Sequence, residues 1–119
     1  MKIYLNPMLI ILGLTGIIYL IAGFIQLKYP PRKINSLYGY RTKLSMKSKE
    51  TWEFAQQFSA KKSLQIGLLM LILGIASIFL PTDTKEIQAW LSVLLVILFS
   101  GILIYLTEKK LKEKFEKNF

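Results

Sequence analysis

Residues 8–27 read MLIILGLTGIIYLIAGFIQL, a run of 20 residues without a charged side chain. Two more uncharged runs follow, of 17 residues at 64–80 and of 20 residues at 87–106. A helix that rises about 1.5 Å per residue needs about 20 apolar residues to cross a hydrocarbon layer about 30 Å thick. The sequence therefore predicts an all-α membrane protein with three transmembrane helices, folded as a single membrane domain over residues 1–119.

The basic residues lie on alternate sides of these spans. Nine lysines and arginines fall between residues 28 and 62 and five between residues 109 and 117, whereas Lys2 and Lys85 lie on the other side. Basic residues in short loops beside a span are retained in the cytoplasm. We therefore expect the amino terminus outside, a cytoplasmic loop at 28–62 and a cytoplasmic basic tail at 107–119 that extends the third helix. The net charge of +9 then favours the anionic lipids of the inner leaflet as a partner, with no direct binding of nucleic acid.

The composition limits the chemistry that this chain can perform. Cysteine and histidine are both absent, which excludes disulfides, thiolate nucleophiles and the usual protein ligands of zinc, copper and haem. The ionisable side chains inside the spans are those of Tyr19 and Tyr105. We therefore expect no metal, no cofactor and no catalytic residue.

Small residues recur at helical spacing in each span. Because helices in lipid associate by close packing, such faces predict a compact bundle, and glycines on the first span would also allow a homo-oligomer. The small residues are Gly13, Gly16 and Gly23 on the first span, Gly67 and Gly74 on the second, and Ala89, Ser92, Val96, Ser100 and the adjacent Gly101 on the third.

The loop at 28–62 is longer than a simple connection between neighbouring helices needs to be. Its glycine, Gly39, permits a backbone turn, and Arg41 offers a planar charged group that fits a carboxylate or a phosphate. After Ser48, residues 49–62 divide into an apolar face and a polar face that includes Gln56, which predicts an amphipathic interfacial helix between the first and second spans. Its polar face would either contact Arg41 through Glu50 or Glu53, and so hold the loop as a lid, or bind a partner.

The stretch from residue 35 to residue 58, NSLYGYRTKLSMKSKETWEFAQQF, resembles the central motif of the SdpI immunity protein family. The resemblance identifies the chain as a short, single-unit member and extends over the flanking spans. We expect six of the motif's positions to be the working ones: Asn35, Arg41, Thr42, Ser45, Trp52 and Glu53. The match includes Asn35, Gly39, Tyr40, Arg41, Thr42, Ser45, Glu50, Thr51, Trp52 and Ala55.

This resemblance implies a multi-pass protein of the bacterial cell membrane that protects its cell against a membrane-active toxin peptide. It also implies signalling, by drawing a cytoplasmic transcriptional repressor to the membrane. Two other functions stay open on the residues themselves. One is a small membrane transporter or channel subunit, and the other is a membrane enzyme at the inner leaflet, with Glu50 or Glu53 as a base and Arg41 binding phosphate.

Overall fold

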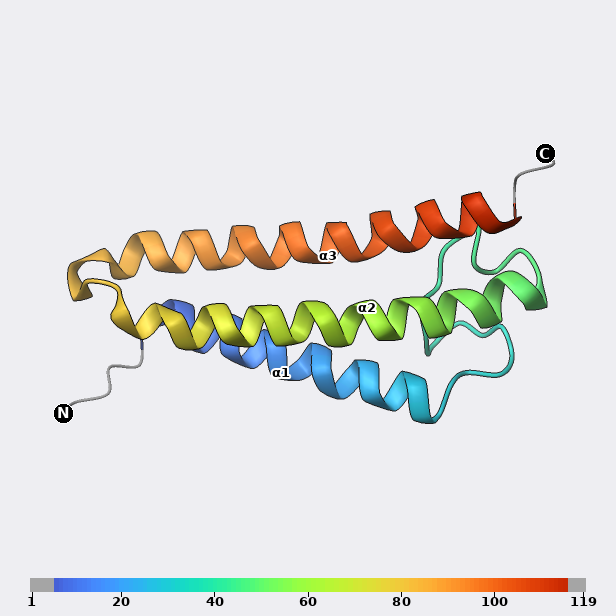
Figure 1. Ribbon diagram of the computed structural model, residues 1–119, viewed down its shortest axis with the longest axis horizontal. Coiled ribbons are helices and arrows are strands. Elements are labelled where there is room, and N and C mark those ends of the chain that lie inside the picture. Colours follow the sequence, from blue (N-terminus) through green and yellow to red (C-terminus); the bar gives the residue numbers. More distant parts are fainter. Residues whose placement is uncertain (1–5, 116–119) are drawn as a thin grey trace.

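A computed structural model describes residues 6–115 and shows a bundle of three long helices (Figure 1). Helix α1 spans Pro7–Lys28, α2 spans Lys49–Ala76 and α3 spans Lys85–Phe115. Two short 3-10 turns, η1 (Ser77–Phe79) and η2 (Thr82–Thr84), join α2 to α3. No strand occurs within residues 6–115, so the expected all-α class is confirmed.

Each predicted span lies within helical structure. Residues 8–27 fall inside α1, residues 64–80 cover the second half of α2 and η1, and residues 87–106 fall inside α3. All three helices are long and apolar enough to cross a membrane. Their outer faces expose large apolar side chains, such as Ile18 at 61% and Leu94 at 60%. Lipid would solvate these side chains favourably, whereas water would not.

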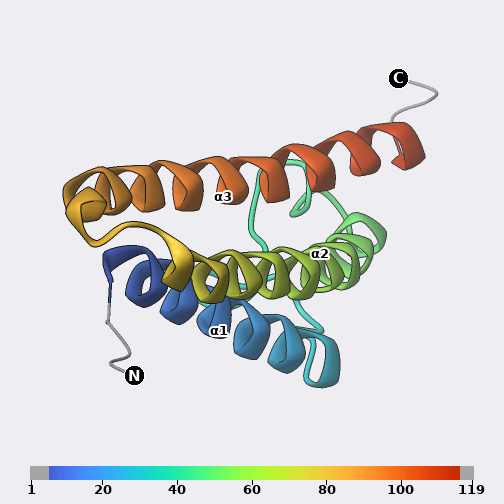
Figure 2. The ribbon, with the colours of Figure 1, turned by 60° about the vertical axis from the view of Figure 1, so that its left-hand side comes forward.

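The two ends of the bundle differ in charge. The loop at 29–48, the first turns of α2 and the last turns of α3 lie together at one end, which we call the basic end (Figure 1). The turn between α2 and α3 lies at the opposite end, where α1 also begins (Figure 2). The separation of charge that the sequence predicted is therefore present along the long axis of the bundle.

Side-chain caps mark the starts of α1 and α2. The Asn6 side chain accepts a hydrogen bond from the Leu9 N–H at 2.6 Å, and Pro7 occupies the first helical position, where no N–H is needed. Asn6 also donates to the Ser77 carbonyl at 2.9 Å, which ties the start of α1 to the end of α2. Ser48 and Thr51 form a reciprocal capping box at the start of α2.

Glycines bring α1 and α2 into backbone contact, as the sequence predicted. A Cβ added to Gly16 would lie 2.7 Å from the Gly67 carbonyl oxygen, and one added to Gly67 would lie 2.8 Å from the Gly16 carbonyl oxygen. A Cβ added to Gly74 would lie 2.9 Å from the Gly13 nitrogen. Any side chain at Gly16 or Gly67 would therefore force the two helices apart.

Helix α3 packs less closely than the other two. Its Ser92 is fully buried and its Ser100 side chain is hydrogen-bonded to the Tyr19 hydroxyl of α1, so part of the predicted small-residue face does meet the bundle. Gly101 is exposed, and a Cβ there would meet nothing within 4 Å. Gly101, which lies beside the small-residue face, therefore takes no part in the packing of the bundle.

A separate interfacial helix is absent from the described part of the chain. Residues 49–62 are instead the first half of α2, which continues without a break to Ala76. Its amphipathic pattern arises because one side packs on the loop and on α1. The helical extension predicted for the tail is confirmed as far as Phe115, and residues 116–119 lie outside the described residues.

Candidate functional site

The motif folds at the basic end, where Gly39 makes the sharpest turn of the loop. Gly39 has φ +107°, a left-handed conformation that a residue with a side chain rarely adopts. A Cβ there would also lie 2.6 Å from Oε1 of Gln56 and 2.7 Å from Cγ of Pro31. Both the conformation and the available space therefore require glycine at this position. The sequence indicated the first of these requirements, the backbone turn.

The next residue, Tyr40, is held through its backbone by Gln56 of α2. The Gln56 side chain accepts from the Tyr40 N–H at 2.7 Å and donates to the Tyr40 carbonyl at 2.8 Å. Its oxygen also accepts a hydrogen bond of 2.8 Å from Gln26 near the end of α1. Gln56 is only 1% exposed, so one buried amide joins the loop to two helices.

Helix α3 joins the same group of contacts through Glu108. The hydroxyls of Tyr40 and Thr42 both donate to Oε2 of Glu108, at 2.8 and 2.9 Å. Burial and the adjacent Glu108 carboxylate raise the pKa of the Tyr40 phenol well above its usual range, so its proton stays available for this bond. We call Gln26, Tyr40, Thr42, Gln56 and Glu108 the polar cluster, and it connects all three helices to the loop.

Ser45 closes the turn that follows. It is fully buried, its hydroxyl donates to the carbonyls of Tyr40 and Thr42, and it accepts from the Thr42 N–H at 2.8 Å. The Thr51 hydroxyl donates to the Ser45 carbonyl at 3.1 Å, which connects this turn to the cap of α2. Thr42 and Ser45 therefore position the loop rather than face solvent.

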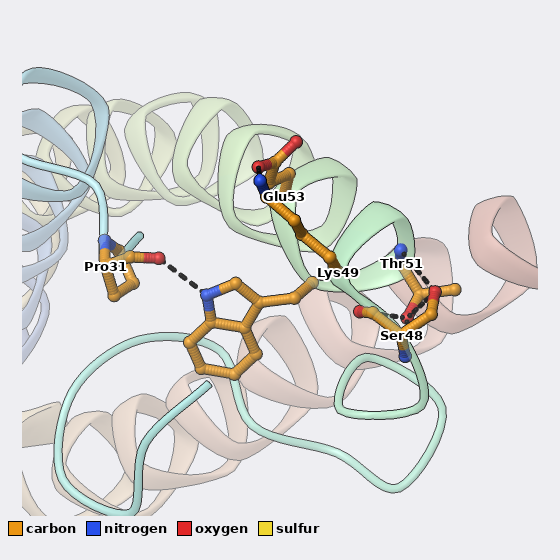
Figure 3. Close-up of polar contacts among 6 residues, drawn as sticks. Pro31, Ser48, Lys49, Thr51 and Glu53 are labelled. Atoms are coloured by element: carbon orange, nitrogen blue, oxygen red, sulfur yellow. Dashed lines mark hydrogen bonds and ion pairs between the residues drawn. The ribbon is translucent and has the colours of Figure 1, made fainter. Parts of the chain in front are cut away.

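Trp52 anchors the other side of the loop. Its side chain is fully buried, and the indole N–H donates to the Pro31 carbonyl at 2.6 Å (Figure 3). Asn35 acts nearby and locally: its side chain accepts from the N–H groups of Leu37 and Tyr38 and donates to the Lys33 carbonyl. Both residues hold the loop's backbone in place.

The charged motif residues lie on the surface and apart from the polar cluster. The side chains of Arg41 and Glu50 are exposed and form no hydrogen bond or ion pair within residues 6–115. Glu53 is exposed and lies 3.9 Å from Lys49, a neighbour on the same helix (Figure 3). The expected contact of Arg41 with Glu50 or Glu53 is therefore wrong. The loop is held as a lid, but by neutral side chains and Glu108.

Sequence reasoning missed three members of the polar cluster, Gln26, Gln56 and Glu108. We placed Gln56 on the polar face of the amphipathic segment, yet it faces inward. Gln26 carried a usable signal, because an amide in an otherwise apolar run needs a hydrogen-bond partner. Nothing in the sequence distinguishes Glu108 from its neighbours, since its partners lie 66 and 68 residues earlier.

The hydrogen-bonded side chains at this end are mostly neutral and hold the loop in position. Residues 6–115 contain no group of three or more carboxylates close enough to hold a metal ion. Glu50 and Glu53 have no neighbour within those residues that would orient them as a base toward a substrate. The side chains that are held firmly are the neutral ones, together with the Glu108 carboxylate.

Comparison with known proteins agrees with the family resemblance of the motif. The sequence profile of the SdpI/YfhL protein family matches residues 32–107, a range that includes the motif loop, α2 and most of α3. The chain is also 35% identical over 97 residues to the uncharacterized protein YfhL of Bacillus subtilis strain 168, and the alignment covers 82% of each protein. No solved structure matches this chain. On the strength of the motif, the flanking helices and both matches, this chain belongs to the SdpI/YfhL protein family.

Proposed function

We propose that this protein is an immunity protein of a bacterial cell membrane, which binds or neutralises a membrane-active toxin peptide. Family membership supports an immunity-type membrane protein. The observation that carries the proposal is the polar cluster, in which motif residues join the loop to three apolar helices. The motif thus serves to build a rigid bundle, a suitable scaffold for binding a peptide in or at the membrane.

The orientation that we propose is amino terminus outside and carboxyl terminus inside. The loop and the end of α3 lie at the same end of the bundle and carry most of the lysines and arginines. Basic residues next to spans favour the cytoplasmic side. The polar cluster would then lie at the inner face, and the turn between α2 and α3 would face a toxin arriving from outside.

Binding accounts for the described residues better than transport or catalysis. Ion-coupled transporters usually carry charged side chains inside their spans, and none of the spans here contains one. An enzyme would need a base with an orienting partner, whereas Glu50 is exposed and unpaired within residues 6–115. We therefore propose a protein without enzymatic activity. Gradient-driven movement of a substrate into liposomes by the pure protein would favour a transporter instead.

Signalling to a cytoplasmic repressor is the further part of the proposal. Arg41 supports it, because its guanidinium lies on the loop's surface without a partner in the described residues, on a stretch of backbone whose neighbours Tyr40 and Thr42 are hydrogen-bonded to α2 and α3. An unpaired arginine suits recognition of an acidic group on a partner. Loss of reporter induction in Arg41→Ala, with survival unchanged, would assign Arg41 to signalling alone.

A survival assay tests the immunity proposal. The gene is expressed in a toxin-sensitive bacterium, which is challenged with a panel of membrane-active peptides, and survival is compared for the wild type, Gln56→Leu and Arg41→Ala. Lys43→Ala is the matched control for Arg41, because it is a nearby exposed cation with no partner in the described residues. We expect the wild type and Lys43→Ala to protect against at least one toxin and Gln56→Leu to fail. Equal survival with the empty vector across the panel would contradict immunity.

A further inference from the structure

A groove lies beside the motif at the basic end, between the loop and the first turn of α2. Its volume is about 630 Å³. The groove has a cationic rim and an apolar floor, and one carboxylate lies at its edge. Its lining residues are Arg32, Lys33, Ile34, Lys49, Trp52 and Glu53.

The cations of this groove are available to a ligand. Arg32 and Lys33 are exposed, and their side chains form no hydrogen bond or ion pair within residues 6–115. Lys49 lies 3.9 Å from Glu53, but the two side chains are 77% and 57% exposed, and such a pair in water holds its partners weakly. The groove therefore has a net positive charge, with two cations that lack a counter-charge in the fold.

The backbone under these cations is fixed. Pro31, which precedes Arg32, accepts the 2.6 Å hydrogen bond from the buried Trp52 indole (Figure 3). The Lys33 carbonyl accepts a 3.0 Å hydrogen bond from Asn35. Across the groove lies the first turn of α2, whose N-terminal N–H groups add positive potential. The groove is thus preorganised for an anion on both of its sides.

The groove also lies at the level where a membrane surface would be. It begins four residues after α1 ends at Lys28, and α1 is one of the three membrane-length helices. The same loop exposes apolar side chains, with Ile34 at 42% and Leu37 at 91%. An exposed leucine next to a cluster of cations suits the boundary between acyl chains and headgroups. Arginine in particular matches the geometry of a phosphate group.

We propose that this groove binds the phosphate headgroup of an anionic phospholipid from the leaflet at the basic end. Arg32 and Lys33 contact the phosphate, Lys49 turns from Glu53 toward it, and Ile34 and Leu37 rest on its acyl chains. This site is separate from the polar cluster and does not depend on immunity. Any membrane protein with this loop would have the lipid site, whether or not it binds a toxin.

The experiment uses the full chain in lipid nanodiscs, with Trp52 as its reporter. Trp90, which lies near the opposite end, is changed to phenylalanine, so that Trp52 is the remaining tryptophan of the two. Nanodiscs of zwitterionic phosphatidylcholine receive increasing amounts of phosphatidylglycerol with brominated acyl chains, and quenching of Trp52 emission measures binding. Brominated phosphatidylcholine measures the background. Arg32→Gln with Lys33→Gln is the test variant, and Lys109→Gln with Lys112→Gln removes two exposed cations from the same end as the matched control.

We expect saturable quenching by phosphatidylglycerol in the wild type and in the control. A direct contact between a cation and the phosphate contributes roughly a fivefold gain in affinity, so the test variant should bind about 30-fold more weakly. Lys109 and Lys112 do not line the groove, so the control should bind less than about threefold more weakly. Equal weakening in both double variants would mean general attraction to the surface and would overturn the proposal. A saturable change of Trp52 emission with inorganic phosphate alone, abolished in the test variant, would identify free phosphate as the ligand and would also overturn it.

Discussion

Replacing Gln56 with leucine removes the amide that joins the loop to α1 and α2. The substitution keeps a side chain of similar size but leaves the Tyr40 N–H, the Tyr40 carbonyl and the Gln26 amide without their bonds of 2.7, 2.8 and 2.8 Å. A buried polar group that loses its partner costs about 1–3 kcal/mol. Because Tyr40 is only partly buried, water would satisfy some of these groups, and we expect a total loss of about 2–4 kcal/mol in the free energy of unfolding.

Titration of the purified protein in mild detergent with sodium dodecyl sulfate, followed by tryptophan fluorescence, measures this loss. Gln57→Leu is the matched control, because Gln57 is the same residue type one position later, is exposed, and its side chain forms no hydrogen bond within residues 6–115. We expect Gln57→Leu to lie within about 0.5 kcal/mol of the wild type. Equal stability of the two variants would refute the assignment of Gln56 to the polar cluster.

Three further substitutions test separate parts of the structure, Gly67→Ala (with Gly101→Ala as its control) and Tyr40→Phe in the same unfolding assay and Trp52→Phe by proteolysis. Gly67→Ala should destabilise the protein by about 1–3 kcal/mol, because its Cβ would lie 2.8 Å from the backbone of α1. Gly101→Ala, whose Cβ would meet nothing within 4 Å, should be neutral or slightly stabilising. Equal effects of the two substitutions would contradict the close contact of α1 and α2. Tyr40→Phe should lower the free energy of unfolding by about 1–2 kcal/mol, because the variant lacks the hydroxyl that donates to Glu108. Because the pKa of Tyr40 is raised in the folded protein, the stability that its hydroxyl contributes is fully present below the ordinary tyrosine pKa of about 10 and declines as the pH rises further. If the free energy of unfolding of the wild type fell no faster with pH than that of Tyr40→Phe above about pH 10, this interpretation would be refuted. Trp52→Phe should increase protease cleavage in the loop, because the loop loses the 2.6 Å bond of the indole, and unchanged cleavage would count against Trp52 as its anchor.

The parts of the fold that depend on local pattern could be predicted from the sequence. Three uncharged runs predicted three helices. The helical spacing of small residues within each span identified the faces of α1 and α2 that carry Gly16 and Gly67, and these two faces do meet. Helical periodicity and the positions of glycines are local features of the sequence, so they can be recognised without knowledge of the fold. The continuity of α2 was also readable, since no proline or glycine lies between Ser48 and Gly67 to end the helix.

The polar cluster could not be predicted in the same way. Tyr40 and Thr42 of the loop were identified as motif residues, but their partner Glu108 lies far along the chain on α3, and a hydrogen bond across 68 residues leaves no local pattern. The inward face of α2 was also assigned wrongly around Gln56. A helical wheel assigns polar residues to the exposed face. Here the buried face of α2 carries the Gln56 amide, which forms its hydrogen bonds with backbone groups of the loop.

The roles of the charged residues were the least predictable. Arg41, Glu50 and Glu53 suggested an ion pair by their types, yet the fold leaves Arg41 and Glu50 exposed and pairs Glu53 with Lys49. An exposed ion pair gains little in water, so nothing forces oppositely charged surface residues to meet. Their proximity in the sequence therefore carried little information about contact.

The orientation of the bundle is tested most directly by labelling single cysteines in intact cells with a membrane-impermeant maleimide. The chain contains no cysteine, so Ser36→Cys and Asp83→Cys each introduce a single thiol, at exposed positions near opposite ends of the bundle. We predict that the thiol at position 83 is labelled in intact cells and that the thiol at position 36 is labelled only after the cells are permeabilised. Labelling of position 36 in intact cells would place the motif loop outside and contradict the proposed orientation.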